Sequence, residues 1–335
     1  MSIEDYRATV KEIQNHVKLP HSEFFDMEFS PHREEFLETF TFYTDTLGRN
    51  ADYGIVPAFM YFNNFTSRNA KAGLLKDTFL LSINMGTVHW LMDNFKLNSN
   101  IESSGIRFIT VTSKFLDTTP QNLMYQMCFH FTVYHELAHL IQKSPYLESY
   151  LDEVPKPNAY SDGRHLLEID ADEYSSLCLG THILQYAEKL FPTSLNTEIL
   201  EGLLVLCLVP VFIYMTSFGG GKGEIYFKEK SHPHPIIRVM LVTMTICHYI
   251  NQSLEVDGKE FSVDYNRVLN RTLQVAHEIE QEVFESPYVD DFIMTLRGNI
   301  KGILDYVDYF DNLKNEDNTL AVYKWNRNIE QREEM

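Results

Sequence analysis

The chain has 335 residues, of which 44% are hydrophobic and 22% charged, a composition that allows one large globular domain or two smaller ones. Its formal net charge is −19, with 47 acidic residues against 28 basic ones. Because so acidic a surface repels the phosphates of nucleic acids and anionic lipids, we expect no nucleic-acid partner and little attraction to anionic membranes.

The four cysteines are scattered through apolar stretches and form no CxxC pair; they are Cys128, Cys178, Cys207 and Cys247. This pattern is typical of small buried side chains in a reducing compartment rather than of a disulfide framework. The amino-terminal segment MSIEDYRATVKEI lacks the basic and apolar regions of a signal peptide. We therefore expect a cytoplasmic protein.

The first part of the chain predicts a mixture of helix, loop and strand. Residues 1–75 indicate helix and loop of unknown role, with helical periodicity from Glu34 to Thr46. Thr78–Met85 (TFLLSINM) predicts a strand that ends in a turn, and Val88–Phe95 predicts the start of a helix. Arg107–Thr112 (RFITVT) is rich in β-branched residues and predicts a second strand.

A long helix is expected in the middle of the chain. Pro120 suits a first helical turn, and Gln121–Gln142 is apolar on one side with few helix breakers. Residues 144–162 contain three prolines and several acids, which predicts a loop that could be a lid. A further helix is expected from Gly163 or Arg164 to Lys189, and Pro192 is expected to end it.

The second half of the chain predicts mainly helix. Leu203–Phe218 has sixteen residues without a charge, fewer than the roughly twenty that span a membrane, and Pro210 lies within it. We expect a buried core helix here, with membrane attachment as the alternative. Ile236–Ile250 predicts another apolar helix, followed by polar helical sequence to about Asp311. Residues 312–335 are charged and are expected to fray.

The segment TVYHELAHLI, residues 132–141, has two histidines at helical spacing. His135 and His139 are four residues apart, so both imidazoles lie on one helix face and can reach one metal ion. Neutral imidazole is a good Zn²⁺ ligand. Glu136 projects about a hundred degrees around the helix, where a carboxylate can exchange a proton with water. The alternative is a pair of core histidines that bond to backbone.

A catalytic zinc site usually has three protein ligands. The segment LEIDADE supplies acids at helical spacing, and its first acid lies 29 residues after the second histidine. Glu168 can complete the coordination, and Asp172, one turn later, can accept the free ring N–H of His135. His165 lies on nearly the same helix face and is a rival third ligand. The other two acids of the segment are interpreted as solvated surface.

The segment SHPHPIIR, residues 231–238, holds two His-Pro pairs before an apolar helix. Proline restricts the neighbouring backbone, so His232 and His234 could be presented to a cleft. A histidine there could donate a hydrogen bond to the oxyanion that forms when water attacks a carbonyl. Arg238, about one turn into the helix, could pair with a carboxylate of the site. The alternative is a polar loop with exposed histidines.

Together, HELAH, E-x-x-A-D and H-P-x-x-x-x-R in this order resemble the gluzincin metallopeptidases, most closely the M48 type of the HtpX-like enzymes. The Lit-type phage-exclusion peptidases are more distantly similar. The resemblance covers residues 78 to 240. It implies that Glu168 is the third zinc ligand, that His232 stabilises the transition state, and that Arg238 is the arginine of the third motif.

The segment TFLLSINMGTVHW also resembles the strand, Asn-x-Gly and helix that precede the zinc helix in this group. In such enzymes an edge strand pairs with the substrate backbone. The resemblance therefore implies a substrate-binding strand that includes Leu80, Ser82, Asn84 and Gly86.

We expect an α+β, mainly helical, zincin-like metallopeptidase with a small sheet and an HExxH active-site helix. Residues 76–250 would form the catalytic core, between an N-terminal region of unknown role (1–75) and a C-terminal helical region (251–335). One Zn²⁺ would be bound by His135, His139 and Glu168, and the partner would be a protein or peptide substrate. The alternatives are a non-catalytic zinc-binding regulator and a membrane-associated protease.

Overall fold

The computed structural model describes residues 1–335 except 144–146, 148–159, 219–224, 285–287, 315–317 and 334–335. The chain divides into two compact units. The sheet unit comprises residues 1–91, 132–156 and 318–335, and the helical unit comprises residues 92–131 and 157–317. The boundary at residue 132 falls within a continuous helix, α6, so this helix contributes residues to both units.

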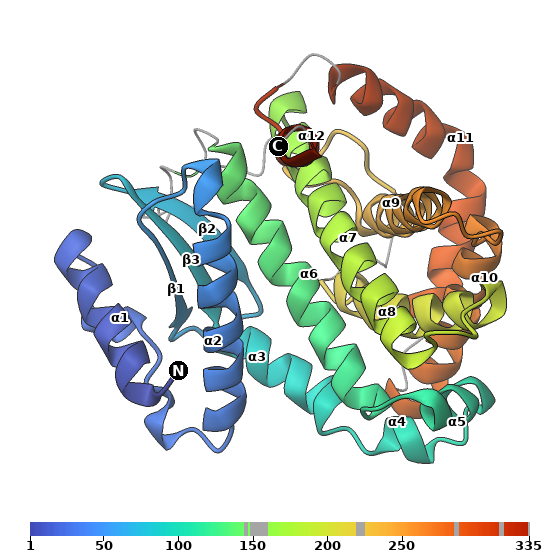
Figure 1. Ribbon diagram of the computed structural model, residues 1–335, viewed down its shortest axis with the longest axis horizontal. Helices are drawn as coiled ribbons and strands as arrows, with labels where there is room; N and C mark the ends of the chain where they lie inside the picture. Colours follow the sequence, from blue (N-terminus) through green and yellow to red (C-terminus); the bar gives the residue numbers. More distant parts are fainter. Residues whose placement is uncertain (144–146, 148–159, 219–224, 285–287, 315–317, 334–335) are drawn as a thin grey trace. The chain divides into compact units, whose positions relative to one another are not determined.

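Within the described part of the chain the structure is mainly helical with one small mixed sheet, which confirms the expected α+β class (Figure 1). The sheet unit contains α1 (Ile3–His16), α2 (Arg33–Arg49), β1 (Ala58–Asn63), β2 (Ala70–Leu75), β3 (Thr78–Asn84), α3 (Met85–Leu91), the end of α6 (Pro120–Gln142) and α12 (Ala321–Glu333).

The helical unit contains the start of α6 and the helices α4 (Asn100–Ser103), α5 (Arg107–Thr112), α7 (Asp162–Leu190), α8 (Thr197–Thr216), α9 (Pro235–Val256), α10 (Tyr265–Ile279) and α11 (Tyr288–Lys314). Within it, α7 packs along α9 and α8 packs along α10, while α11 contacts α7, α9 and α10. The helices expected at Glu34–Thr46, Gln121–Gln142 and Ile236–Ile250 correspond to α2, α6 and α9.

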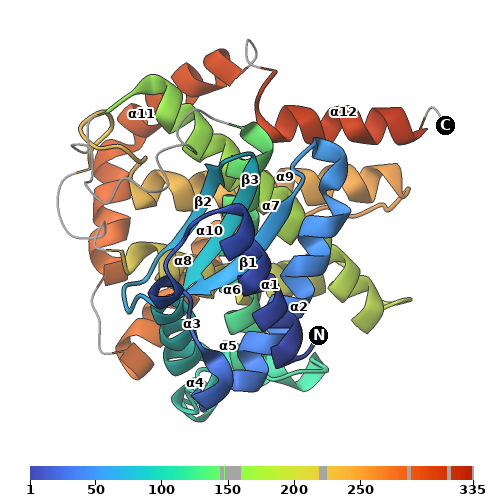
Figure 2. The ribbon, with the colours of Figure 1, turned by 90° about the vertical axis from the view of Figure 1, so that its left-hand side faces the viewer.

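The sheet has the strand order β1-β3-β2. β1 pairs with β3 in parallel, and β2 pairs with β3 in antiparallel register, with Ala72 opposite Leu81. Every residue of β3 is buried. α1 and α2 pack against β1, and Figure 2 shows α1 in front of the strands and α2 beside them. β3 is therefore the central strand, and β2 forms one edge of the described sheet.

The Asn-x-Gly segment at the end of β3 holds the loop between β1 and β2. The Gly86 N–H donates to the Phe65 carbonyl at 3.0 Å, and the Asn84 amide donates to Ser67 Oγ at 2.9 Å. A Cβ on Gly86 would lie 2.0 Å from the Thr66 carbonyl oxygen, so only glycine fits there. These contacts fix the chain just before it enters β2.

The strand expected at Arg107–Thr112 is wrong, because the segment forms α5. Phe108 and Ile109 are buried, and the helix packs against α8. The hydroxyls of Thr110 and Thr112 donate to helix carbonyls four residues earlier, at 3.1 and 2.8 Å. Tertiary packing thus overrides the weak β propensity of these residues.

The long apolar segment Leu203–Phe218 falls mostly within α8, which is long and apolar enough to cross a membrane by length and composition. In its most apolar window, 89% of the residues are buried inside the protein. α8 contacts α5, α7, α9 and α10 (Figure 1), and Pro210 lies within the helix. These contacts support the expectation of a core helix.

The polar sequence up to Asp311 forms α10 and α11, as expected. The segment expected to fray contains α12 instead, and Leu320 and Ala321 at its start are buried. The loop predicted at residues 144–162 lies almost wholly outside the described residues. The sequence predicts three regions with different roles, residues 1–75, 76–250 and 251–335. The two compact units do not test that division, so it stays a prediction.

Candidate metal centre

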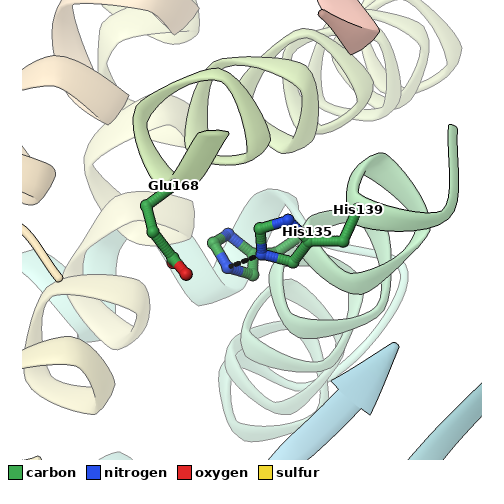
Figure 3. A group of neighbouring side chains, drawn as sticks. All are labelled: His135, His139 and Glu168. Carbon is green, nitrogen blue, oxygen red and sulfur yellow. Dashed lines mark hydrogen bonds between the residues drawn. The ribbon is translucent and has the colours of Figure 1, made fainter. Parts of the chain in front are cut away.

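The end of α6 brings the two motif histidines together. His135 and His139 lie one turn apart, with their Nε2 atoms 3.2 Å from each other and their ring planes at 89°. Figure 3 shows both rings extending from this helix. His135 is 8% exposed, and the apolar neighbours Leu137, Ala138 and Leu140 are fully buried. The burial of this helix fixes the direction of both imidazoles.

The distance between the two Nε2 atoms suits the binding of one metal ion by both histidines. Two nitrogens bound to one tetrahedral zinc ion at about 2.0–2.1 Å lie about 3.3 Å apart. His139 Nδ1 lies 2.9 Å from Gln142 Oε1. Since the amide oxygen only accepts, Nδ1 carries the proton, and the Nε2 lone pair faces His135. Sequence reasoning missed Gln142, although the spacing H-x-x-Q on a helix could have indicated it.

Glu136 has a different environment from the histidines. Its carboxylate Oε2 accepts a hydrogen bond of 2.8 Å from the backbone N–H of Ala72 in β2. This N–H is directed away from β3, because it is donated to a side chain outside the sheet. The glutamate between the two histidines is thus held at the edge of β2, on the side away from β3. No sequence pattern pointed to Ala72, because its donor is a backbone group.

In the helical unit, α7 begins at the cap residue Ser161 and carries Glu168, which is 7% exposed. His232 Nε2 lies 3.2 Å from Glu168 Oε1, and His232 Nδ1 lies 2.9 Å from Ser231 Oγ. The side chain of His232 remains 48% exposed. The structure therefore brings together the acid of the second sequence motif and the first histidine of the third.

Asp172 and Arg238 form a buried two-point ion pair. The Arg238 Nε and Nη2 atoms donate to the two Asp172 carboxylate oxygens, each at 2.7 Å, and Asp172 is fully buried. Burial alone would lower the pKa of Arg238, but the adjacent Asp172 carboxylate outweighs this effect and raises it. The arginine thus pairs with a motif carboxylate, one of the partners expected for it. The contact expected between Asp172 and His135 stays a prediction.

His165, the rival third ligand, uses both ring nitrogens elsewhere. Nδ1 lies 2.5 Å from the Tyr306 hydroxyl, and Nε2 lies 2.7 Å from the Lys230 carbonyl oxygen. Burial lowers the pKa of His165, which favours the neutral ring. With both nitrogens engaged in this way, His165 is a structural residue.

The expected position of the substrate strand needs a correction. Leu80, Ser82 and Asn84 lie in β3, which is hydrogen-bonded to a neighbour on each side. Gly86 lies beyond the strand and holds the preceding loop. Strand order cannot be inferred from a single sequence, and an extended peptide can add only to an edge strand. Of the described strands near Glu136, β2 has the free edge.

Among the described residues, the side chains that could together bind a metal ion are His135 and His139 of the sheet unit and Glu168 of the helical unit (Figure 3). Comparisons of the chain with protein-family models, curated proteins and solved structures find no match.

Proposed function

We propose that the protein is a zinc-dependent endopeptidase of the gluzincin kind, similar to the M48 type, and that it hydrolyses peptide bonds of a protein substrate inside the cell. The observation that carries the proposal is the pair of Nε2 atoms 3.2 Å apart on α6, with Glu136 between the two histidines in the sequence. Two imidazoles and one carboxylate, from His135, His139 and Glu168, are a donor set that suits catalytic zinc.

Zinc bound by these three residues would supply Lewis acidity, which polarises a carbonyl and lowers the pKa of water. Glu136 would take a proton from water at its carboxylate and later return it to the leaving amine. Metal binding alone does not need this carboxylate, because the two histidines and Glu168 already provide three ligands. Glu136 therefore favours a catalytic role over a zinc-binding regulator.

The free edge of β2 is the proposed binding site for the substrate backbone. An extended peptide that pairs with β2 would accept from outward N–H groups such as that of Ala72. Ala72 now donates to Glu136, so substrate binding would release the Glu136 carboxylate from this hydrogen bond.

His232 is proposed to donate a hydrogen bond to the developing oxyanion. Its ring is partly exposed, as a residue that meets substrate must be, and it contacts Glu168. Arg238 would hold Asp172, and Asp172 would orient His135, as the sequence predicts. These two roles are positional.

The proposal is tested by measuring bound zinc and proteolysis in the wild type, Glu136→Gln and His135→Ala. Glu136→Gln should retain about one zinc ion and lose about 10²–10⁴-fold in cleavage rate, since it removes the base but not a ligand. His135→Ala should lose the zinc. Zinc is measured by elemental analysis, and cleavage by a proteome-wide search for new termini. Glu12→Gln, an exposed change on α1, is the matched control.

Equal cleavage by wild type and Glu136→Gln would contradict the mechanism. A wild type that binds zinc and produces no new termini would instead identify a non-catalytic zinc-binding protein. A wild type that binds no zinc would refute both ideas.

A further inference from the structure

The segment 225–232, which leads to His232, rests on one face of α11. Phe227 packs against Tyr306, with ring centroids 5.9 Å apart. A Cβ on Gly302 would lie 2.9 Å from the Phe227 ring, so glycine allows this close approach. The ammonium group of Lys228 lies 4.0 Å from the centre of the Tyr309 ring. Gly302, Tyr306 and Tyr309, which span about two turns of α11, thus form the surface against which the segment packs.

His165 adds a buried link between this surface and the segment. It is fully buried, and Phe310 of α11 stacks on its ring at 6.0 Å. The Lys230 carbonyl only accepts, so His165 Nε2 carries the proton. The neutral ring then accepts from the Tyr306 hydroxyl at Nδ1. The hydrogen bond from Tyr306 therefore favours the His165 tautomer that has its proton on Nε2 and donates it to the Lys230 carbonyl.

Lys230 is two residues before His232, so its position limits where the His232 backbone can lie. On the other side of His232, Pro233 restricts the backbone and His234 caps α9 by accepting from the Ile236 N–H at 3.2 Å. The imidazole of His232 is thus presented to Glu168 by a short segment fixed at both ends.

We propose that Tyr306 and His165 are positioning residues for His232, and that α11 supports the proposed active site. The inference rests on the proposed function, because His232 is the residue they would position for catalysis. It also assigns a role to the C-terminal region, for which the sequence indicated none. A misplacement of about 1 Å in a catalytic group can reduce a rate about 10²-fold, so the hydroxyl of Tyr306 matters although it is remote from substrate.

The test compares Tyr306→Phe with Tyr309→Phe, which removes a hydroxyl from the same helix but leaves the His165 link intact. For Tyr306→Phe we expect kcat to fall about tenfold with little change in KM, since outer contacts of metal sites typically contribute about 10–100-fold. Tyr309→Phe should resemble the wild type. In a His232→Gln background, Tyr306→Phe should cause no further loss of kcat.

A second measurement does not depend on activity. In zinc-free protein with ¹³C-labelled histidine rings, the His232 resonance, assigned by its loss in His232→Gln, should move in Tyr306→Phe and not in Tyr309→Phe. Gly302→Ala is a second variant that should move the same resonance by displacing Phe227. Because Gly302→Ala keeps the Tyr306 hydroxyl, it still tests the inference if Tyr306→Phe does not fold.

An equal loss of kcat in both backgrounds would mean that Tyr306 acts only on the general structure, and it would overturn the inference. An unmoved His232 resonance in Tyr306→Phe and Gly302→Ala would also overturn it. If the wild type cleaves no peptide, the proposed function fails, and the resonance alone decides whether Tyr306 positions His232.

Discussion

At Gly86 the backbone of the β1–β2 loop passes so close that a side chain has no room. A Cβ there would lie 2.0 and 2.3 Å from the oxygen and carbon of the Thr66 carbonyl. Backbone atoms cannot move aside as a flexible side chain would. The constraint matters beyond stability, because this loop leads directly into β2, the strand whose Ala72 N–H contacts Glu136.

Gly86→Ala should lower the free energy of unfolding by about 1–3 kcal/mol, the usual cost of overpacking. Gly48→Ala is the matched control, because Gly48 lies in α2 with nothing within 4 Å of an added Cβ. It should raise stability by about 0.5–1 kcal/mol, since alanine favours helix. Urea unfolding of the two variants and the wild type measures both changes in the free energy of unfolding. Equal stability of Gly86→Ala and wild type would contradict the contact.

Side-chain spacing predicted part of the candidate site. The four-residue interval between His135 and His139 placed both Nε2 atoms together, because helical pitch is a local property. Glu168 and Arg238 were also recognised from their motifs. The Ala72 partner of Glu136 could not be foreseen, since a backbone N–H leaves no mark in a sequence. The central position of β3 was missed because strand order depends on distant parts of the chain.

Among the helices, α6 ends at a left-handed residue, and its last turn is contacted by α12 of the sheet unit. Lys143, directly after the helix, has a positive φ of 54°, which ends the helical course of the chain. The Lys324 ammonium of α12 donates to the Ile141 carbonyl at 2.7 Å. The last carbonyls of a helix have no partner within it, so this cation satisfies one of them and also favours the negative end of the helix dipole.

Lys324→Met should therefore lower the free energy of unfolding by about 1–2 kcal/mol and speed amide exchange in the last turn of α6. Hydrogen exchange measured by mass spectrometry reports the local change, and urea unfolding reports the global one. Lys301→Met is the control, because Lys301 forms an exposed pair with Asp305 on α11. It should change stability little. Faster exchange in both variants alike would show that Lys324 has no special role at α6.

The elements themselves were predicted unevenly. Long amphipathic or apolar helices such as α2, α6 and α9 were recognised, because many residues contribute to each pattern. The β-branched residues of α5 predict a strand, but in so short a segment burial against α8 outweighs intrinsic propensity, and the segment is helical. The helix α12 was missed because its sequence is polar and charged.

At the scale of the molecule, the sheet unit is assembled from three separate stretches of chain, which no local pattern could reveal. The helical unit contains a second, half-buried histidine pair, one member of which is five residues before His135 on α6. His130 of α6 and His182 of α7 stack at 4.9 Å with an interplanar angle of 14°. Burial lowers the pKa of His130 from 6.5 to about 3, with a contribution from His182, and burial lowers the pKa of His182 as well.

These shifts predict acid sensitivity. Below about pH 6.5 the unfolded chain binds protons at both positions while the folded protein does not, so stability falls as the pH falls toward 3. His130 alone should contribute about 1 kcal/mol of loss between pH 7.5 and 5.5. His130→Phe keeps an aromatic ring against His182 and should reduce this loss. Urea unfolding at the two pH values tests it, with exposed His248→Phe as the control. Equal pH dependence in all three proteins would refute the assignment.

The burial of α8 has a consequence for synthesis on the ribosome. Its apolar surface is covered in the folded protein by α9 and α10, among other helices, and both follow it in the chain. About 60 residues must be added after α8 before α10 is complete, which takes about 3–12 s at about 5–20 residues per second. During that interval the nascent chain presents a helix apolar enough to be taken for a membrane segment. This exposure ends once α9 and α10 have been synthesised and pack against α8.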